Sequence, residues 1–194
     1  MRLSILIILS AILTLQSHFI NPRLFAQQEE QVKEDDRFKE QVDEKMKYYK
    51  EKYEAAFDAP FEVVYRAAKQ SISELNCMIM NESYSQTDEG LYKGRVKSDI
   101  CVLVDGKDST WDVLQKYSVD LPIIRGGVWQ NGGIQYNFIL KETKDGKVLV
   151  TLKGEISGFE EYVTYLRHFW ESNGYLETMM LDRLKKNIES PPKQ

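Results

Sequence analysis

Residues 134–156 have the sequence IQYNFILKETKDGKVLVTLKGEI, and this stretch decides the fold. Apolar and polar residues alternate on both sides of Lys144-Asp145-Gly146, which is typical of two antiparallel strands joined by a tight turn. A three-residue loop with Gly146 in the left-handed region brings apolar residues opposite apolar residues, whereas a two-residue turn would oppose them to polar ones. The pairs expected from the three-residue loop are Phe138 with Leu152, Leu140 with Val150, and Tyr136 with Gly154.

A second hairpin is predicted upstream, over residues 76–104. A three-residue Asp-Glu-Gly loop pairs Thr87 with Leu91. The same register places Cys77 opposite Cys101, on one face of the hairpin. Because an even pair of cysteines in an exported chain is a disulfide candidate, we predict a cross-strand disulfide. Two free buried thiols are the alternative.

The second strand of this upstream hairpin carries a row of cations. Lys93, Arg95 and Lys97 lie on one face of the strand, and apolar residues lie on the other. A solvated strand face explains the row. The alternative is contact with anionic lipid headgroups or an acidic envelope polymer, where each cation near a membrane surface contributes about 1 kcal/mol.

Several shorter signals lie around the two hairpins. Apolar residues at helical spacing predict a helix over about residues 59–75. Ser109-Thr110-Trp111-Asp112 resembles a capping box and predicts a short helix that ends near Tyr117. Asn131-Gly132 predicts a two-residue hairpin turn, because both positions tolerate positive φ.

Two helices are predicted at the carboxy-terminal end of the chain. Ser157 and Glu160 form a capping box at the start of the first helix, which Ser172-Asn173-Gly174 interrupts. Its apolar stripe comprises Phe159, Tyr162, Val163, Leu166, Phe169 and Trp170. The second helix covers about residues 176–188.

The order of these elements predicts the fold class. Short β-turns mean antiparallel pairing, and helices at both ends of the strand region can lie over the sheet. We therefore expect an α+β domain with an antiparallel β-sheet of about 4–6 strands, made of a hairpin plus a meander. One face of the sheet is expected to be covered by an N-terminal helix and two C-terminal helices.

The amino terminus predicts export. Leu3–Leu15 is a run of thirteen residues without a charge, which suits a signal peptide and is short for a bilayer span of about 20 residues. Ala26 precedes a tolerable cleavage site, and an uncleaved anchor is the alternative. The expected divisions are a signal peptide or anchor (1–26), a charged helical stalk (27–57), the α+β domain (58–190) and a disordered tail (191–194).

Two families are similar in pattern and order over residues 58 to 188. The entry Asp58-Ala59-Pro60-Phe61-Glu62-Val63-Val64, then sheet and a long final helix, resembles helix-grip domains of the START/Bet v 1 type. The helix and hairpin from Val64 to Lys97, with Gly90 at the turn, resemble the small α+β modules of outer-membrane assembly lipoproteins of the BamC kind. The first resemblance implies more strands and an unbroken final helix. The second implies a lipidated cysteine, which this sequence lacks near residue 20.

Residues that could carry chemistry are few. Beyond residue 26 the one histidine is His168, and it has no partner at metal-ligand spacing. Glu155, Glu160 and Glu161 form an acidic cluster, which the positive end of a helix dipole explains. A carboxylate pair for acid–base chemistry is the alternative. We predict no catalytic residue, no metal and no cofactor.

The predicted function is a non-catalytic, exported binding or assembly module, either periplasmic or tethered to the membrane and facing the periplasm or exterior. A net charge of −4 without a dense Lys/Arg block argues against nucleic acid. The alternative is a carrier of a small hydrophobic ligand, held between the sheet and the C-terminal helices. The partner is thus an envelope protein or such a ligand, and membrane contact is expected only through an uncleaved N-terminal segment. The candidate ligand or partner patch comprises Arg125, Trp129, Tyr136, Phe138, Tyr162, Leu166 and Met180.

Overall fold

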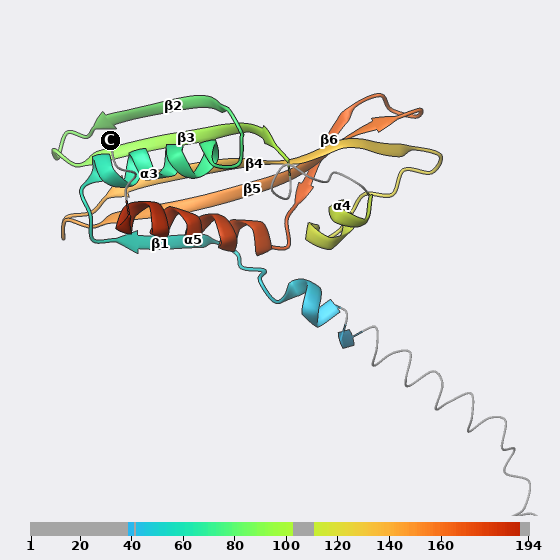
Figure 1. Cartoon of the computed structure of the whole chain (residues 1–194), viewed down its shortest axis with the longest axis horizontal. Helices are drawn as coiled ribbons and strands as arrows, with labels where there is room; N and C mark the ends of the chain where they lie inside the picture. Colours follow the sequence, from blue (N-terminus) through green and yellow to red (C-terminus); the bar gives the residue numbers. More distant parts are fainter. Residues whose placement is uncertain (1–38, 41, 103–110, 191–194) are drawn as a thin grey trace, which may run out of the picture. The chain divides into compact units, whose positions relative to one another are not determined.

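The computed structural model describes residues 39–40, 42–102 and 111–190 (Figure 1). The chain divides into residues 1–44 and a compact unit from residue 45 onward. The elements are β1 (Tyr53–Phe57), α3 (Phe61–Ser73), β2 (Ile79–Gln86), β3 (Tyr92–Cys101), α4 (Trp111–Tyr117), β4 (Val128–Glu142), β5 (Val148–Glu161), β6 (Arg167–Glu171) and α5 (Tyr175–Glu189). The predicted signal segment and carboxy-terminal tail lie outside the described residues.

The strands form one six-stranded antiparallel sheet, so the α+β class is confirmed. The strand order is β1-β5-β4-β3-β2, and β6 also pairs with β5. The register predicted for the central hairpin is confirmed: Phe138 faces Leu152, and the turn has Gly146 at a φ of 79°. Since β4 and β5 are the two longest strands, this hairpin is the frame on which the other strands assemble.

The upstream hairpin also has the predicted loop and disulfide. The backbone N–H of Thr87 donates to the carbonyl of Leu91 over 2.8 Å, which closes the three-residue loop. Cys77 and Cys101 are bonded to each other, with their Cα atoms 5.2 Å apart. The disulfide joins the segment before β2 to the end of β3, and so holds the edge strand onto the sheet.

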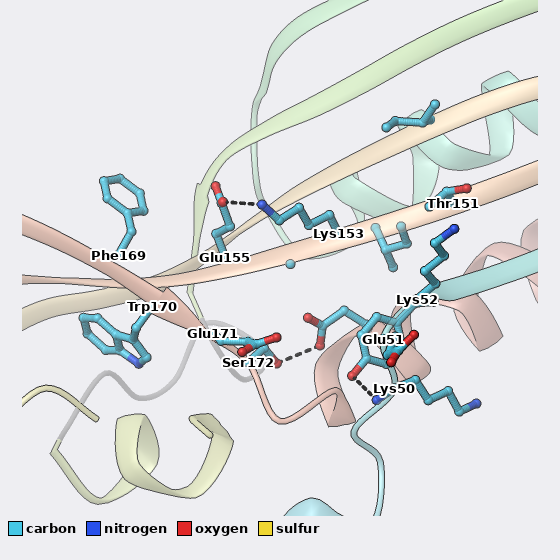
Figure 2. Close-up of a pocket in the computed structure, with 15 residues that line it drawn as sticks. Lys50, Glu51, Lys52, Thr151, Lys153, Glu155, Phe169, Trp170, Glu171 and Ser172 are labelled. Atoms are coloured by element: carbon cyan, nitrogen blue, oxygen red, sulfur yellow. Dashed lines mark hydrogen bonds and ion pairs between the residues drawn. The ribbon is translucent and has the colours of Figure 1, made fainter. Parts of the chain in front are cut away.

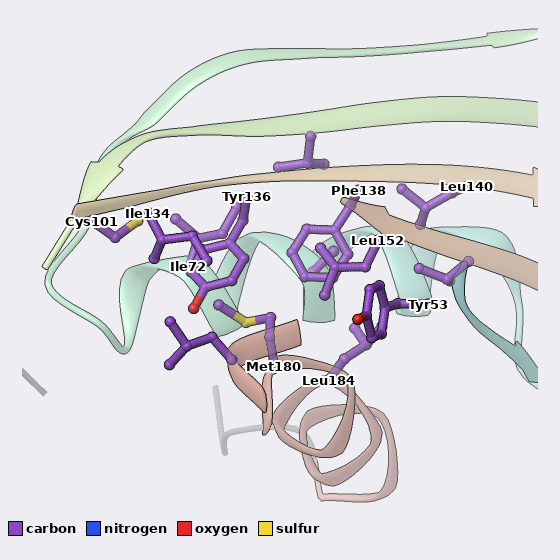
Figure 3. Packing of buried hydrophobic residues seen from close by; sticks show 14 of the residues in the cluster. Tyr53, Ile72, Cys101, Ile134, Tyr136, Phe138, Leu140, Leu152, Met180 and Leu184 are labelled. Atoms are coloured by element: carbon purple, nitrogen blue, oxygen red, sulfur yellow. The ribbon is translucent and has the colours of Figure 1, made fainter. Parts of the chain in front are cut away.

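The core lies between the sheet and the helices α3 and α5. Helix α3 contacts β2, β3 and β4, helix α5 contacts β1 and β5, and the two helices also contact each other. In the segments 134–140 of β4 and 148–156 of β5 the even-numbered residues are buried, and Phe138 and Leu152 pack with Met180 and Leu184 of α5 (Figure 3). Odd-numbered residues of these two segments lie on the opposite face of the sheet, as strand alternation requires.

The predicted helical stalk is wrong at its carboxy-terminal end. Residues 42–46 are helical, but Tyr53–Phe57 is the strand β1, in which Tyr53 pairs with Leu152 and Phe57 with Val148. Five residues are too few to separate a helical stripe from strand alternation. Pairing with a strand some 95 residues away decides between them, and local spacing does not reveal that pairing.

The first of the two predicted C-terminal helices is wrong. Strand β5 continues to Glu161, a turn follows, and β6 returns antiparallel with Phe169 opposite Ser157. Residues 159–161 of β5 pair with Val128–Gln130 of β4 on the edge opposite β6. This pairing with a distant segment favours a strand where the local spacing predicts a helix. Of the two predicted helices, only the last is present, as α5.

The predicted turn at Asn131-Gly132 is a bulge within β4. The pairing of β4 with β5 shifts between Gln130 and Gly133, and Asn131 has a φ of 49°. The positive φ was therefore expected correctly, but the extra residues are absorbed inside one long strand. The bulge lets β4 run on to Val128 and support the β5–β6 hairpin.

Candidate functional site

The tip of the β5–β6 hairpin exposes an unusual number of large apolar side chains. The exposed fractions are 62% for Tyr162, 52% for Val163, 62% for Tyr165 and 60% for Leu166. We call these four residues the tip patch. Single exposed apolar residues are ordinary, but a cluster within five positions marks a contact surface.

Neighbouring segments add apolar surface beside the tip patch. Val128 lies opposite Glu161 in the register and is exposed, and Ile123 is exposed in the loop before β4. A Cβ built on Gly126 would meet Val163 at 3.9 Å, so this loop lies against the turn. The apolar surface therefore extends beyond the hairpin itself.

A buried carboxylate holds the turn in shape. Glu160 accepts hydrogen bonds from the backbone N–H groups of Val163 and Thr164, at 3.2 and 2.6 Å, and from the Thr164 hydroxyl at 2.6 Å. Tyr162 and Tyr165 have φ values of 87° and 53°, which are costly for residues with a Cβ. Backbone in such regions persists only where its surroundings impose it, and it is concentrated at functional sites.

The hydrogen bonds also decide the charge of Glu160. Burial raises the pKa of this carboxyl, but the donors of Thr164 and Val163 outweigh burial and lower it below its ordinary value. A carboxylate is acceptor-only, which suits a turn that offers it several donors. Glu160 therefore stabilises the turn in its ionised form.

The base of the hairpin is packed and hydrogen-bonded. The ring of Trp129 is buried, 5.1 Å from that of Trp170 and 5.4 Å from that of His168 between centroids. His168 in turn shares a hydrogen bond of 2.8 Å with the Thr164 hydroxyl. The tip patch therefore stands on a rigid aromatic support.

A cleft of about 500 Å³ lies where the line of β6 and β1 is broken beside β5 (Figure 2). Tyr53 of β1 pairs with Leu152, and Glu171 of β6 pairs with Glu155. Within the part of the chain that the structure describes, this edge of β5 therefore has no strand partner at positions 153 and 154. Lysines and glutamates line the cleft together with Phe169 and Trp170. The cleft is thus a gap in an otherwise continuous edge strand.

Three of the four carboxylates that line the cleft, Glu155, Glu171 and Glu177, have hydrogen-bond partners. Lys153 bonds Glu155 at 2.8 Å, as Figure 2 shows, and the hydroxyl of Tyr49 donates to Glu171 at 3.0 Å. Ser172 donates to the buried Glu177 at 2.7 Å. These three acids are thus held in place by a neighbouring ammonium or hydroxyl group.

Glu177 fills the gap in the edge strand. It lies in the first turn of α5 and is buried, and the N–H of Gly154 is one of the groups that lower its pKa. A Cβ on Gly154 would lie 2.5 Å from the Glu177 carboxylate, so only glycine lets the carboxylate approach this closely. The Glu177 carboxylate thus accepts the Gly154 N–H, which in a continuous sheet would donate to a neighbouring strand.

Burial raises the pKa of Glu177 despite these donors. Because the folded state then binds the proton more tightly than the unfolded state, protonation favours folding. The stabilising contribution is complete below the ordinary carboxyl pKa of 4.5 and is lost as the pH rises through the raised value. Wild type should therefore lose stability relative to Glu177→Gln as the pH rises above about 4.5, measured by urea unfolding.

Glu160→Gln provides the opposite sign in the same experiment. Because the pKa of the Glu160 carboxyl is lowered in the folded state, its ionised form stabilises the fold. Wild type should therefore gain stability over Glu160→Gln as the pH rises. Equal pH profiles for wild type and Glu177→Gln would contradict the assignment at Glu177.

The structure separates the residues of the predicted patch. Tyr136, Phe138 and Met180 are packed in the core, and Trp129 is buried under the hairpin, where its indole N–H donates to the carbonyl of Pro122. Arg125 is exposed in the loop before β4. Tyr162 and Leu166 lie apart from that core cluster, exposed together at the tip of the β5–β6 hairpin. The structure therefore does not gather all these residues into one pocket wall, and the ligand pocket stays a prediction.

The predicted acidic cluster and His168 lie on strands rather than on the expected helix. Glu155, Glu160 and Glu161 lie on β5, so a helix dipole does not explain them. His168 lies on β6, half-buried, rather than on a surface helix. The tip patch was missed because its residues were assigned to a helix face; positive-φ tyrosines leave no signal in sequence spacing.

Within the described part of the chain, no group of three or more His, Cys, Asp or Glu side chains could hold a metal ion. Over the same residues, no helix is both long and apolar enough to cross a membrane. No family model, no curated protein and no solved structure matches the chain.

Proposed function

We propose that the chain is a non-catalytic binding or assembly module of the cell envelope, and that it contacts a protein partner through the tip patch. The observation that carries this proposal is the exposure of Tyr162, Val163, Tyr165 and Leu166 on a turn fixed by a buried carboxylate. Tyrosine is enriched at protein interfaces, because it combines a large apolar body with a polar tip.

Rigidity supports this proposal. A contact surface that is already in its bound shape avoids part of the entropic cost of association. The donors to Glu160, the bond between Thr164 and His168, and the tryptophan pair beneath them hold the turn without a partner. A hairpin kept only for folding would not need to hold apolar side chains in water.

Export is part of the proposal and rests on the sequence. The uncharged run Leu3–Leu15 is typical of a signal peptide. The Cys77–Cys101 disulfide agrees with an oxidising compartment.

The resemblance to helix-grip domains also enters here as a proposal. The strands β1 and β6 and the unbroken helix α5 agree with what that resemblance implies. We further propose that α3 and α5 cover one face of the sheet and leave the other open, because both contact it from the side on which Phe138 and Leu152 are buried. The packed side chains on that side do not favour a carrier.

Photo-crosslinking in cells of the source species tests the proposal. Tyr165→p-benzoylphenylalanine in the full chain should give one discrete crosslinked protein after irradiation. Tyr162→Ser with Leu166→Ser in the same chain should lower the yield by about thirtyfold, the effect of losing one interface hot spot. Lys185→p-benzoylphenylalanine, at an exposed position of α5, is the matched control. No product at 165, or the same product at 185, would contradict the proposal.

A further inference from the structure

A second surface, on the side of the sheet that faces away from the core, has a different character. The side chains of β3, β4 and β5 that alternate with the buried ones include five cations. They are Lys93, Arg95, Lys97, Lys141 and Lys153. We call them the basic face.

The strand register brings these cations together. Lys93 lies directly opposite Lys141, and Lys97 and Lys153 are both paired with Asn137 between them. At about 3.4 Å per residue and 4.8 Å per strand, the basic face covers roughly 14 by 10 Å. It is therefore one patch rather than scattered charges.

The cations of β3 and β4 have few acidic neighbours. Among the described residues, Lys93, Arg95, Lys97 and Lys141 form no ion pair, and only Lys153 is bonded to an acid, Glu155. The guanidinium of Arg95 donates instead to the neutral amide of Asn137 at 2.7 Å. The patch therefore carries a net positive charge.

The pairing of Lys93 with Lys141 works against folding. Like charges directly opposite each other in a sheet are destabilising. The whole chain is acidic, with a net charge of −4, so the cations are concentrated on one surface against the overall balance. An anionic ligand would remove the repulsion, whereas solvent only screens it.

We propose that the basic face binds the surface of an anionic lipid bilayer. A bilayer suits the patch, because the five cations lie along three strands and a planar array of headgroups can meet them together. Phe169, exposed on β6 opposite Ser157, belongs to the same side of the sheet and adds an aromatic group suited to the membrane interface. This site is separate from the tip patch and does not depend on it.

Vesicle binding by the full chain tests the proposal. One set of vesicles contains phosphatidylcholine alone, and the other contains about a quarter phosphatidylglycerol. The uncharged run Leu3–Leu15 is expected to bind both sets of vesicles equally. The difference in binding between the two sets therefore reports the effect of lipid charge. Binding to the anionic set should exceed binding to the neutral set and should fall at high salt. A net acidic chain without a basic face would show the reverse preference.

Matched triple variants locate the effect. Lys93→Gln, Arg95→Gln and Lys141→Gln together should lower binding to anionic vesicles by roughly tenfold to a hundredfold. Arg66→Gln, Lys185→Gln and Lys186→Gln remove the same charges from α3 and α5 and should lower it far less. Lys93→Arg with Lys141→Arg should retain binding, and thermal unfolding checks that each variant is folded.

Three results would overturn the lipid assignment. One is wild type without a preference for anionic vesicles, and another is an equal loss in both triple variants. The third is binding to soluble polygalacturonate with none to vesicles, which would identify an acidic polymer as the ligand. Tyr165→Ser should leave vesicle binding unchanged, so a failure of the tip-patch proposal is seen separately.

Discussion

Gly174→Ala is expected to lower the free energy of unfolding by about 3 kcal/mol, because it combines two costs. Gly174 precedes α5 with a φ of 85°, where a residue with a Cβ is strained. A Cβ there would also overlap the hydroxyl of Tyr53 and the backbone carbonyl of Tyr48. For a domain of this size the melting temperature should fall by roughly 6–12 °C, measured by thermal unfolding.

Gly146→Ala is the matched control for this prediction. Gly146 has nearly the same φ, 79°, but a Cβ there would meet nothing within 4 Å. Its loss should be only about 1 kcal/mol, the cost of the backbone conformation alone. Equal losses in the two variants would contradict the close approach of Tyr48 and Tyr53 to the start of α5.

Removing the disulfide should have an effect of similar size. Cys77 and Cys101 are separated by 24 positions in the sequence, and closing a loop of that length stabilises the folded state by about 3.5 kcal/mol in the chain-entropy model. Cys77→Ala with Cys101→Ala, and wild type treated with reductant, should both unfold at lower urea concentration.

Two observations check that this effect comes from the bond itself. The double alanine variant should not respond to reductant, since it has no disulfide to lose. Oxidised wild type should show no reactive thiol after denaturation. Two reactive thiols in that experiment would contradict the bond between Cys77 and Cys101.

The parts of the fold that were predictable are those fixed by local turns. In the central hairpin, the left-handed Gly146 and the alternation around it admit one register that matches the faces, and that register is present. The loop at Thr87–Leu91 fixes the upstream hairpin similarly as far as Asn81, where the register shifts before the two bonded cysteines. Each of these two hairpins is formed within a segment of about 25 residues, so local sequence contains the information that sets its register.

The segment 157–171 shows why the rest was not predictable. Ser157 and Glu160 have the spacing of a capping box, and the apolar residues after them have helical spacing. In the structure Glu160 accepts backbone N–H groups three and four positions later in a hairpin turn. The same residue types serve both arrangements, and pairing with Val128–Gln130 of β4 and with β6 decides for the strand.

Only part of the candidate site could be predicted, because its exposure also depends on long-range strand pairing. Tyr162 and Leu166 were selected for their aromatic and apolar character, but as walls of a pocket. Exposure depends on the strand–turn–strand path, which turns Tyr162 and Leu166 away from the core. The basic face was visible as the row Lys93, Arg95 and Lys97. Lys141 and Lys153 join it only through the register of the sheet.

A tip patch that faces water requires residues 155–171 to form a hairpin. Nuclear Overhauser effects between backbone protons of this segment test that most directly. We expect contacts across the hairpin between Ser157 and Phe169 and between Glu155 and Glu171. Contacts between residues three apart throughout 157–170, which mark a helix, would contradict it.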